Sequence, residues 1–227
     1  MKNKHRLSAI ICAKAEPKTL PKVVRSVARY VDEIVVVLAP NDQLDGVSQE
    51  TSKCKLRVLH DTGKGKGEAL RLGASVATGS IFVFMDADGS HKPYDIPKLV
   101  QPICDVQADM VVASRGRGGS DELHGTVEKM IRLIGSSIIT TIINIRFKVE
   151  LTDSQNGFRA VSSSAWKKLA LHTNTFAIEQ EMLMQALKRG LRVAEIPSHE
   201  SARMYGSSKI NLWVSSHHFL WVLLRNL

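Results

Sequence analysis

Two aspartates separated by one residue provide the sharpest chemical signal in the sequence. Asp86 and Asp88 follow the apolar run Ile81–Met85, which is typical of a buried β-strand. Carboxylates at the end of such a strand can converge on one hard divalent cation, and that cation could bridge a diphosphate. An isolated Asp-x-Asp pair also caps helices and shapes turns, so the spacing alone leaves both interpretations open.

A segment rich in glycine and lysine lies shortly before the aspartates. Across Gly63–Gly67 the sequence alternates Gly and Lys, just ahead of an amphipathic stretch. Glycines that open a helix expose backbone N–H groups to an anion, and lysines add positive charge toward phosphate. The segment is not a Walker A loop, because Gly-x4-Gly-Lys-Ser/Thr is absent. A flexible turn before a helix is the alternative interpretation.

Short apolar runs alternate with amphipathic stretches through the first half of the chain. This alternation predicts an α/β fold with a mostly parallel sheet, helices on both faces and ligands at the carboxyl ends of the strands. The predicted strands are Leu7–Ala13, Glu33–Leu38, Lys55–Leu59, Ile81–Met85 and Met110–Ala113, and the predicted helices are Leu20–Tyr30, Gly67–Ala77 and Asp95–Ile103.

The second half contains longer helical patterns. Residues 115–128 change to Arg, Gly, Ser and acidic side chains, which predicts a mobile loop. Helices are predicted over Val127–Phe147 and over Phe176–Arg189, the second ended by Gly190. A strand is predicted over Val193–Ile196. For the apolar part of the long helix, a buried core helix and an acceptor-side helix are both open.

Composition and charge bound the class of protein. The chain has 227 residues, 44% of them hydrophobic, and 31 Lys+Arg against 22 Asp+Glu give a net charge of +9. These values exclude a disordered, collagenous or disulfide-scaffold protein. The three cysteines share no metal-type spacing, which favours a reducing, cytoplasmic location. No secretory segment is expected. The apolar windows Leu133–Ile145 and Leu212–Leu224 are shorter than the roughly 20 residues of a spanning helix, so no transmembrane segment is expected.

Taken in order, the motifs resemble those of family 2 glycosyltransferases, and within them the dolichyl-phosphate mannose synthases and polyprenyl-phosphate hexose synthases. The resemblance extends from Ile10 to Lys209. The motifs that carry it are Gly65-Lys66-Gly67, Val83-Phe84-Met85-Asp86-Ala87-Asp88, Ala113-Ser114-Arg115, Asp153 with Gly157-Phe158-Arg159, and Arg203-x-x-Gly206-x-Ser208-Lys209.

The resemblance implies a GT-A fold, a nucleotide diphosphate-sugar donor, and Mg²⁺ or Mn²⁺ held by Asp86 and Asp88. It implies that Asp88 and Asp153 are catalytic, Asp153 as a carboxylate near the acceptor; ordering of the following turn is the alternative role for Asp153. The donor-binding residues that it implies are Ala13, Glu16, Lys66, Asp86, Ala87, Asp88, Arg115, Arg203 and Lys209, the last two in a segment that closes over the diphosphate.

The acceptor is expected to be a polyprenyl phosphate of the dolichyl type, at the cytosolic face of a membrane. A small soluble phosphorylated acceptor, as in glucosyl-3-phosphoglycerate synthases, is the alternative. A nucleic-acid-binding protein is a weaker alternative, because the chain has no helix-turn-helix pattern or basic motif interleaved with aromatics. A non-catalytic relative is a further alternative, because two N-terminal motifs depart from the family pattern. Residues 1–209 are expected to form the catalytic domain. The amphipathic tail, 210–227, is expected to contact a membrane surface, with a helix docked on the main domain or a homodimer contact as the alternatives.

Two departures from the family pattern concern the nucleotide. Cys12–Glu16 replaces the family's Pro-Ala-Tyr-Asn-Glu, and Pro40–Asp45 replaces Asp-Asp-Gly-Ser-x-Asp. The nucleobase is therefore not predicted. Glu181 matches an acidic residue of the family, Glu179 lies on a similar helix face, and either is expected to pair with Arg159 or Lys188.

Overall fold

The computed structural model describes residues 5–44, 50–51, 54–122, 126–205 and 212–227. The strands are β1 (Leu7–Ala13), β2 (Glu33–Leu38), β3 (Glu50–Thr51), β4 (Cys54–His60), β5 (Ile81–Asp86), β6 (Met110–Ser114), β7 (Arg159–Ser162) and β8 (Val193–Pro197). They form an eight-stranded mixed sheet in the order β3-β4-β2-β1-β5-β7-β6-β8. Neighbouring strands run parallel except at β3 and β7, which pair antiparallel with their neighbours.

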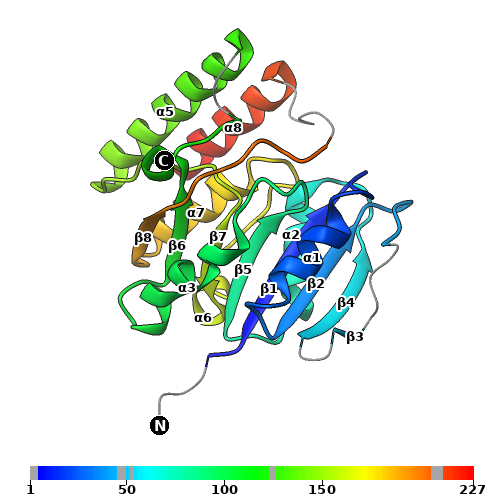
Figure 1. The fold of residues 1–227 in the computed structure, drawn as a ribbon. Helices are drawn as coiled ribbons and strands as arrows, with labels where there is room; N and C mark the ends of the chain where they lie inside the picture. The colour runs from blue at the N-terminus through cyan, green and yellow to red at the C-terminus, as the bar shows by residue number, and fades with distance from the viewer. Residues whose placement is uncertain (1–4, 45–49, 52–53, 123–125, 206–211) are drawn as a thin grey trace.

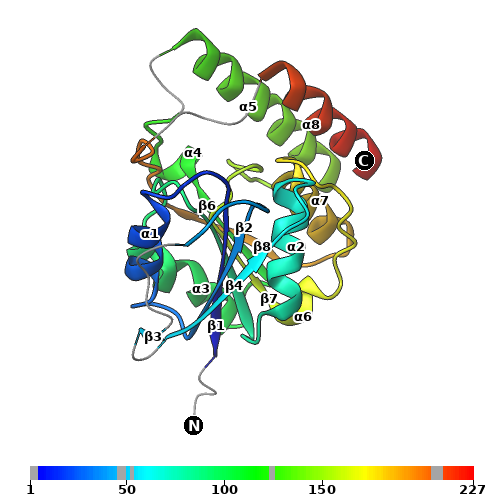
Figure 2. The same cartoon turned by 90° about the vertical axis from the view of Figure 1, so that its right-hand side faces the viewer.

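Helices cover both faces of the sheet (Figure 1, Figure 2). One face carries α1 (Leu20–Val27) and α3 (Ile96–Cys104), which follows the 3₁₀ turn η1 (Pro93–Asp95). The other face carries α2 (Lys66–Val76), α6 (Ser163–Trp166) and α7 (Ile178–Lys188). The remaining helices are α4 (Arg115–Gly118), α5 (Val127–Phe147) and α8 (Leu212–Asn226).

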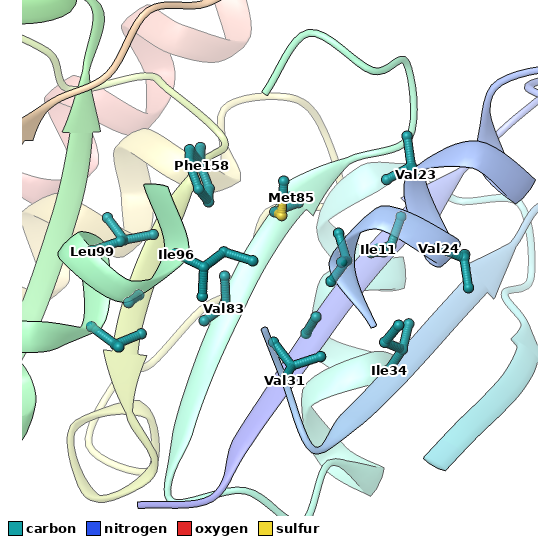
Figure 3. Packing of buried hydrophobic residues seen from close by; sticks show 14 of the residues in the cluster. Ile11, Val23, Val24, Val31, Ile34, Val83, Met85, Ile96, Leu99 and Phe158 are labelled. Atoms are coloured by element: carbon teal, nitrogen blue, oxygen red, sulfur yellow. The ribbon is translucent and has the colours of Figure 1, made fainter. Parts of the chain in front are cut away.

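The central strands are apolar throughout because both of their faces are covered. In β1, Ile11 packs into the cluster beneath α1 and α3, whereas its neighbour Ile10 packs into the cluster beneath α2 and α7. Figure 3 shows the first cluster, in which Val23 and Val24 of α1 point toward Ile11. The parallel register brings the carboxyl ends of β1, β2, β4 and β5 to one edge of the sheet.

The α/β fold predicted from hydrophobic periodicity is confirmed, and each predicted strand and helix is present with its ends shifted by a few residues at most. The prediction missed β3, β7, α4 and α6. These elements have two or four residues, too few to display a period. The loop predicted over 115–128 begins instead as α4, whose N-cap is the Ser114 hydroxyl, accepting from Arg117 N; residues 123–125 lie outside the described part.

The long helix α5 is largely exposed, so its interpretation as a buried core helix is wrong. Ile134 is 52% and Ile138 55% exposed, while Ile139 and Ile143 pack with Leu223 of α8. Within the described residues α5 alone is long and apolar enough to cross a membrane on length and composition, and 17% of its apolar window is buried. The apolar window considered in the sequence, Leu133–Ile145, is shorter than α5 because it leaves out residues at both ends of the helix.

A buried carboxylate joins the amino ends of three central strands. Glu33, fully buried in β2, accepts hydrogen bonds from Ser8 Oγ of β1 at 2.5 Å and from Thr78 N, just before β5, at 2.7 Å. Arg57 Nε of β4 lies 3.2 Å from its second oxygen. Burial raises the pKa of Glu33, but these donors outweigh it and the net pKa is lowered. Glu33 therefore stabilises the sheet in its ionised form.

We expect Glu33→Gln to lower the free energy of unfolding by about 1–3 kcal/mol at neutral pH, because the buried donors lose a charged acceptor. A lowered folded-state pKa means that this stabilisation exists above the ordinary pKa of 4.5 and is lost as pH falls below it. Urea unfolding at neutral and acidic pH measures the difference, which should shrink in acid. Glu128→Gln, which breaks an exposed pair with Arg132, is the control and should have little effect. An equal loss at both pH values would contradict the role of the charge.

Candidate functional site

A cavity of about 540 Å³ opens at the carboxyl ends of β1, β2, β4 and β5. Ligands of open parallel sheets bind at this edge. The residues that line it are Cys12, Ala13, Lys14, Glu16, Ala39, Pro40, Asp61, Gly63, Gly65, Lys66, Ala69, Asp86, Ala87, Asp88, Phe176 and Arg203. The wall thus combines apolar surface with several charged side chains, as expected of a site for a charged small molecule.

The first aspartate of the Asp-x-Asp pair faces a lysine. Asp86 Oδ1 lies 2.5 Å from Nζ of Lys66, the first residue of α2. The same ammonium lies 2.7 Å from Oε1 of Glu179, in the first turn of α7. Burial raises the pKa of Asp86, but Lys66, His91 and Arg203 together outweigh it and bring the pKa to about 2. Burial likewise lowers the pKa of Lys66, and the two carboxylates reverse this, so its pKa is raised. Asp86 and Lys66 are therefore both charged at neutral pH.

The second aspartate faces an arginine from a distant part of the chain. Asp88 Oδ2 lies 3.3 Å from Arg203 Nη2. Asp88 Oδ1 accepts hydrogen bonds from the backbone N and hydroxyl of Ser90, at 3.0 and 2.7 Å. Ser90 thus orients the aspartate.

The segment before residue 206 runs across the end of β5. Met204 N donates to Asp88 O at 3.0 Å, and Ser201 N donates to Ser90 O at 2.9 Å. Gly89 has a φ of +79°, and a Cβ there would lie 2.9 Å from the Met204 side chain. These contacts bring Arg203 to the cavity. Lys209, predicted for the same closing segment, lies outside the described residues.

The glycines of the Gly-Lys segment allow close packing against the loop before α7. A Cβ at Gly65, where φ is +128°, would lie 2.4 Å from Asn174 O, and one at Gly67 would lie 2.1 Å from Thr173 O. Gly67 N donates to Asn174 O at 2.9 Å. The Gly67 amide is therefore engaged by the protein itself, while Gly63, Gly65 and Lys66 line the cavity.

The acidic residues of α7 have other partners than predicted. Glu181 accepts hydrogen bonds from His172 N and Thr173 N, at 3.0 and 2.9 Å, and so holds the loop that packs on the glycines. Glu179 pairs with Lys66. The predicted pairing of either residue with Arg159 or Lys188 is wrong. The guanidinium of Arg159 donates to backbone carbonyls instead, because β7 turns this side chain into the interior.

Gly157 lies directly against the pair of Asp86 and Lys66. A Cβ at this position would lie 2.8 Å from Asp86 Oδ2 and 3.2 Å from Lys66 Nζ. The next residue, Phe158, stacks on the buried His91 ring at 5.2 Å between centroids. His91 Nδ1 in turn accepts from Asp86 N at 3.2 Å. The Gly157-Phe158 motif thus supports Asp86 from behind the cavity.

Asp153 forms an ion pair with Arg115, and neither residue is among the described residues that line the cavity. Arg115 Nε lies 2.6 Å from Asp153 Oδ2, and Arg115 Nη2 lies 2.9 Å from Oδ1. Asp153 Oδ1 also accepts from the backbone N of Gln155 and of Asn156, both at 3.0 Å. Burial raises the pKa of Asp153, but Arg115 outweighs it and the net pKa is lowered. This geometry is that of a residue that orders the following turn; the catalytic role of Asp153 stays a prediction.

Most of the predicted donor-binding residues meet at the cavity. Its lining includes Ala13, Glu16, Lys66, Asp86, Ala87, Asp88 and Arg203. Sequence reasoning missed Cys12, Lys14, Asp61 and Phe176 in the lining, and Glu179 behind it. Asp61 directly follows β4, so the convergence of strand ends could have found it. Phe176 comes from a remote loop, and no local pattern marks it.

The comparison with protein families assigns this chain to a known family. Residues 8–170 match the family described as Glycosyl transferase family 2. The chain belongs to this family. The resemblance seen in the motifs is thereby confirmed, and this protein is a glycosyltransferase with the predicted GT-A-like fold.

Characterised relatives of this glycosyltransferase include enzymes named for polyprenyl phosphates. It is 34% identical over 152 residues to the UDP-N-acetylglucosamine–dolichyl-phosphate N-acetylglucosaminyltransferase of Methanococcus voltae, covering 63% of this chain and 57% of that one. It is 27% identical to the undecaprenyl-phosphate mannosyltransferase of Micrococcus luteus, covering 91% of this chain and 88% of that one. The chain therefore spans little more than half of the first relative and most of the second.

A solved structure has the same fold. The glucosyl-3-phosphoglycerate synthase of Mycobacterium tuberculosis, in complex with Mn²⁺ and UDP-glucose, superposes with a TM-score of 0.75 and 20% identity. The match covers 99% of this chain and 80% of that one. At this identity the likeness concerns the fold.

We expect Gly157→Ala to displace the Asp86 and Lys66 side chains while the protein stays folded, because the new methyl group meets flexible side-chain ends. Binding of UDP or GDP in the presence of Mn²⁺, measured by calorimetry, should weaken on the order of tenfold. The control is Gly135→Ala in α5, where nothing lies within 4 Å of the new Cβ. That change should leave binding unaltered and stabilise the helix by about 0.5–1 kcal/mol. Unchanged binding in Gly157→Ala would contradict this account.

Proposed function

We propose that this glycosyltransferase transfers a hexose from a nucleotide diphosphate-sugar to a polyprenyl phosphate, with Mg²⁺ or Mn²⁺ as cofactor. The observation that carries the proposal is the donor-sized cavity that contains Asp86 and Asp88, each facing a cationic side chain. Charged groups of both signs at one point suit a diphosphate together with a divalent cation. The names of the polyprenyl-phosphate relatives support the acceptor.

The donor atoms fit a hard divalent cation that is shared with the substrate. Asp86 and Asp88 offer carboxylate oxygens, which Mg²⁺ and Mn²⁺ prefer. Within the described residues no three His, Cys, Asp or Glu side chains gather as a complete ligand set. Mg²⁺ in such sites is held by one or two carboxylates plus substrate phosphates, so two aspartates are sufficient. When bound, the cation would neutralise charge on the diphosphate leaving group.

The protein's own cations serve the same leaving group. Lys66 and Arg203 are far apart in the sequence but both line the cavity, and each pairs with an aspartate at the end of β5. Fixed positive charges beside a departing diphosphate stabilise the transition state more than the ground state. Arg203 lies on the segment that crosses the cavity, so its guanidinium can exchange Asp88 for a donor phosphate when the donor binds.

The ion pair of Asp153 favours a phosphate acceptor over a hydroxyl acceptor. A hydroxyl nucleophile needs a base, whereas a phosphate is already anionic at neutral pH. Both oxygens of Asp153 accept hydrogen bonds from Arg115. A carboxylate held in this way, with a lowered pKa, is a poor base. The arrangement therefore supports a reaction in which the acceptor needs no deprotonation.

The location that we propose is the cytosolic surface of a membrane, contacted through α5 and α8. These helices lie next to each other outside the sheet (Figure 1, Figure 2). Arg132 and Arg146 of α5 add positive charge that suits an anionic lipid surface. A second copy of the chain is the other occupant that this face could take. The exposed apolar side chains on it are Val127, Met130, Ile131, Ile134, Ile138, Ile145, Leu220, Trp221 and Leu224.

The proposed reaction is tested with radiolabelled sugar nucleotides, chosen by a thermal-shift panel of GDP-, UDP-, ADP- and dTDP-sugars with Mn²⁺. Label should pass into an organic-phase product when a polyprenyl phosphate is supplied. Asp88→Asn should reduce the rate by roughly a hundredfold, because the cation loses a charged ligand. Label that enters only a water-soluble product, with phosphoglycerate as acceptor, would favour the small-acceptor alternative. No transfer to either acceptor would contradict the proposal.

For the membrane contact we expect the double variant Ile134→Ser, Ile138→Ser to reduce flotation with liposomes of anionic phospholipid, because exposed apolar surface is removed from the contact. Val106→Ser is the control, since Val106 is 68% exposed and follows α3, outside α5 and α8. Its flotation should equal that of the unmodified protein. Light scattering tests the other occupant: a dimer that dissociates in the double variant, without any flotation, would assign the face to a second copy.

A further inference from the structure

Glu179 reaches the donor cavity only through Lys66. Lys66 and Asp86 line the cavity, whereas Glu179 lies behind them, with a side chain that is 3% exposed. Its Oε1 is 2.7 Å from Lys66 Nζ, which is 2.5 Å from Asp86 Oδ1. A carboxylate buried to this degree is costly unless it is paired, and Lys66 supplies the pairing charge.

The position of Glu179 is rigidly set. It lies in the first turn of α7, where a negative charge is favoured by the helix dipole. Its backbone carbonyl accepts a hydrogen bond from Nη1 of the fully buried Arg159, at 2.6 Å. Arg159 in turn belongs to β7, which pairs with β5. The carboxylate is thus held on the same framework as Asp86, so the Lys66 ammonium has a defined place between the two.

Lys66 supplies the counter-charge for two carboxylates, Asp86 and Glu179. One ammonium, with three N–H donors, faces two carboxylates. Were Lys66 paired with Asp86 alone, its positive charge would fully offset that of the aspartate. Because Glu179 shares the ammonium, Lys66 offsets the charge of Asp86 only in part. A carboxylate whose counter-charge is shared attracts a divalent cation more strongly than one that is fully paired.

We propose that Glu179 is a positioning residue of the donor site: it draws the Lys66 ammonium away from full pairing with Asp86, and so keeps Asp86 available as a ligand for a divalent cation. This inference rests on the proposed function, because it concerns the cation used there. Glu179 itself touches neither donor nor cation. Its effect passes through the position and the shared charge of Lys66.

Two substitutions separate the charge of Glu179 from its shape. Glu179→Gln keeps the shape and removes the charge, whereas Glu179→Asp keeps the charge and shortens the side chain. Mn²⁺ binding is titrated by the EPR signal of free Mn²⁺, in the presence of UDP and, separately, of GDP. We expect Glu179→Gln to weaken Mn²⁺ binding on the order of tenfold, and Glu179→Asp to weaken it less. Thermal unfolding of each variant verifies that the protein is folded.

Glu181→Gln is the matched control, since it removes the same charge from the same helix at a residue that bonds to His172 N and Thr173 N. Its Mn²⁺ affinity should stay near that of the unmodified protein. The inference is overturned if Glu179→Gln binds Mn²⁺ as the unmodified protein does, because the charge would then have no effect. It is also overturned if Glu179→Gln binds Mn²⁺ better than Glu179→Asp, because the length of the side chain would then matter more than its charge. If the unmodified protein binds no Mn²⁺ with either nucleotide, the proposed donor chemistry itself fails.

Discussion

The ammonium of Lys66 is the interaction on which the rest of the site depends. It joins α2, β5 and α7 through two carboxylates, at 2.5 and 2.7 Å, at the edge of the sheet where the cavity opens. Glu179, whose side chain is 3% exposed, would be costly to bury without a counter-charge, and Lys66 supplies it. Gly157, which leaves room for the pair, and Gly67, which lets the loop before α7 approach α2, are consequences of the same constraint.

A second buried ion pair gives the other side of the site a different character. Arg115 and Asp153 bind each other through two hydrogen bonds and stand outside the cavity lining. Lys66 and Arg203, which pair with Asp86 and Asp88, line the cavity. The ion pair of Asp153 instead orders the turn that follows Asp153. Asp86, Asp88 and their cationic partners thus line the cavity at the end of β5, whereas Asp153 is held by Arg115 outside that lining. This division is what one expects when the nucleophile is already an anion.

The helices outside the sheet follow another physical rule. Ile139 and Ile143 of α5 pack with Leu223 of α8 and Met184 of α7, which fixes both helices to the catalytic core. Ile142 and Phe147 pack against the same cluster, whereas other apolar residues of α5, such as Ile134 and Ile138, are exposed. The helix therefore presents one face to the protein and another to its surroundings. Exposed apolar area of this kind is a cost in water that a lipid surface or a second copy removes. Attachment to α7 places that face on the same rigid framework that carries Glu179.

The order of strands and helices, and the place of Asp86, Asp88 and Lys66 at the carboxyl edge of the sheet, could be predicted from the sequence, because hydrophobic period and strand ends are local properties. The partners of these residues were decided by the tertiary structure. Glu179 meets Lys66, Arg203 meets Asp88 and Asp153 turns to Arg115 because segments far apart in the chain pack together. The antiparallel β7 was likewise invisible, since four residues show no period and its place is set by pairing with β5 and β6. Local patterns specify elements and their ends; which buried charges share an ion pair depends on long-range packing, for which a single sequence carries no signal.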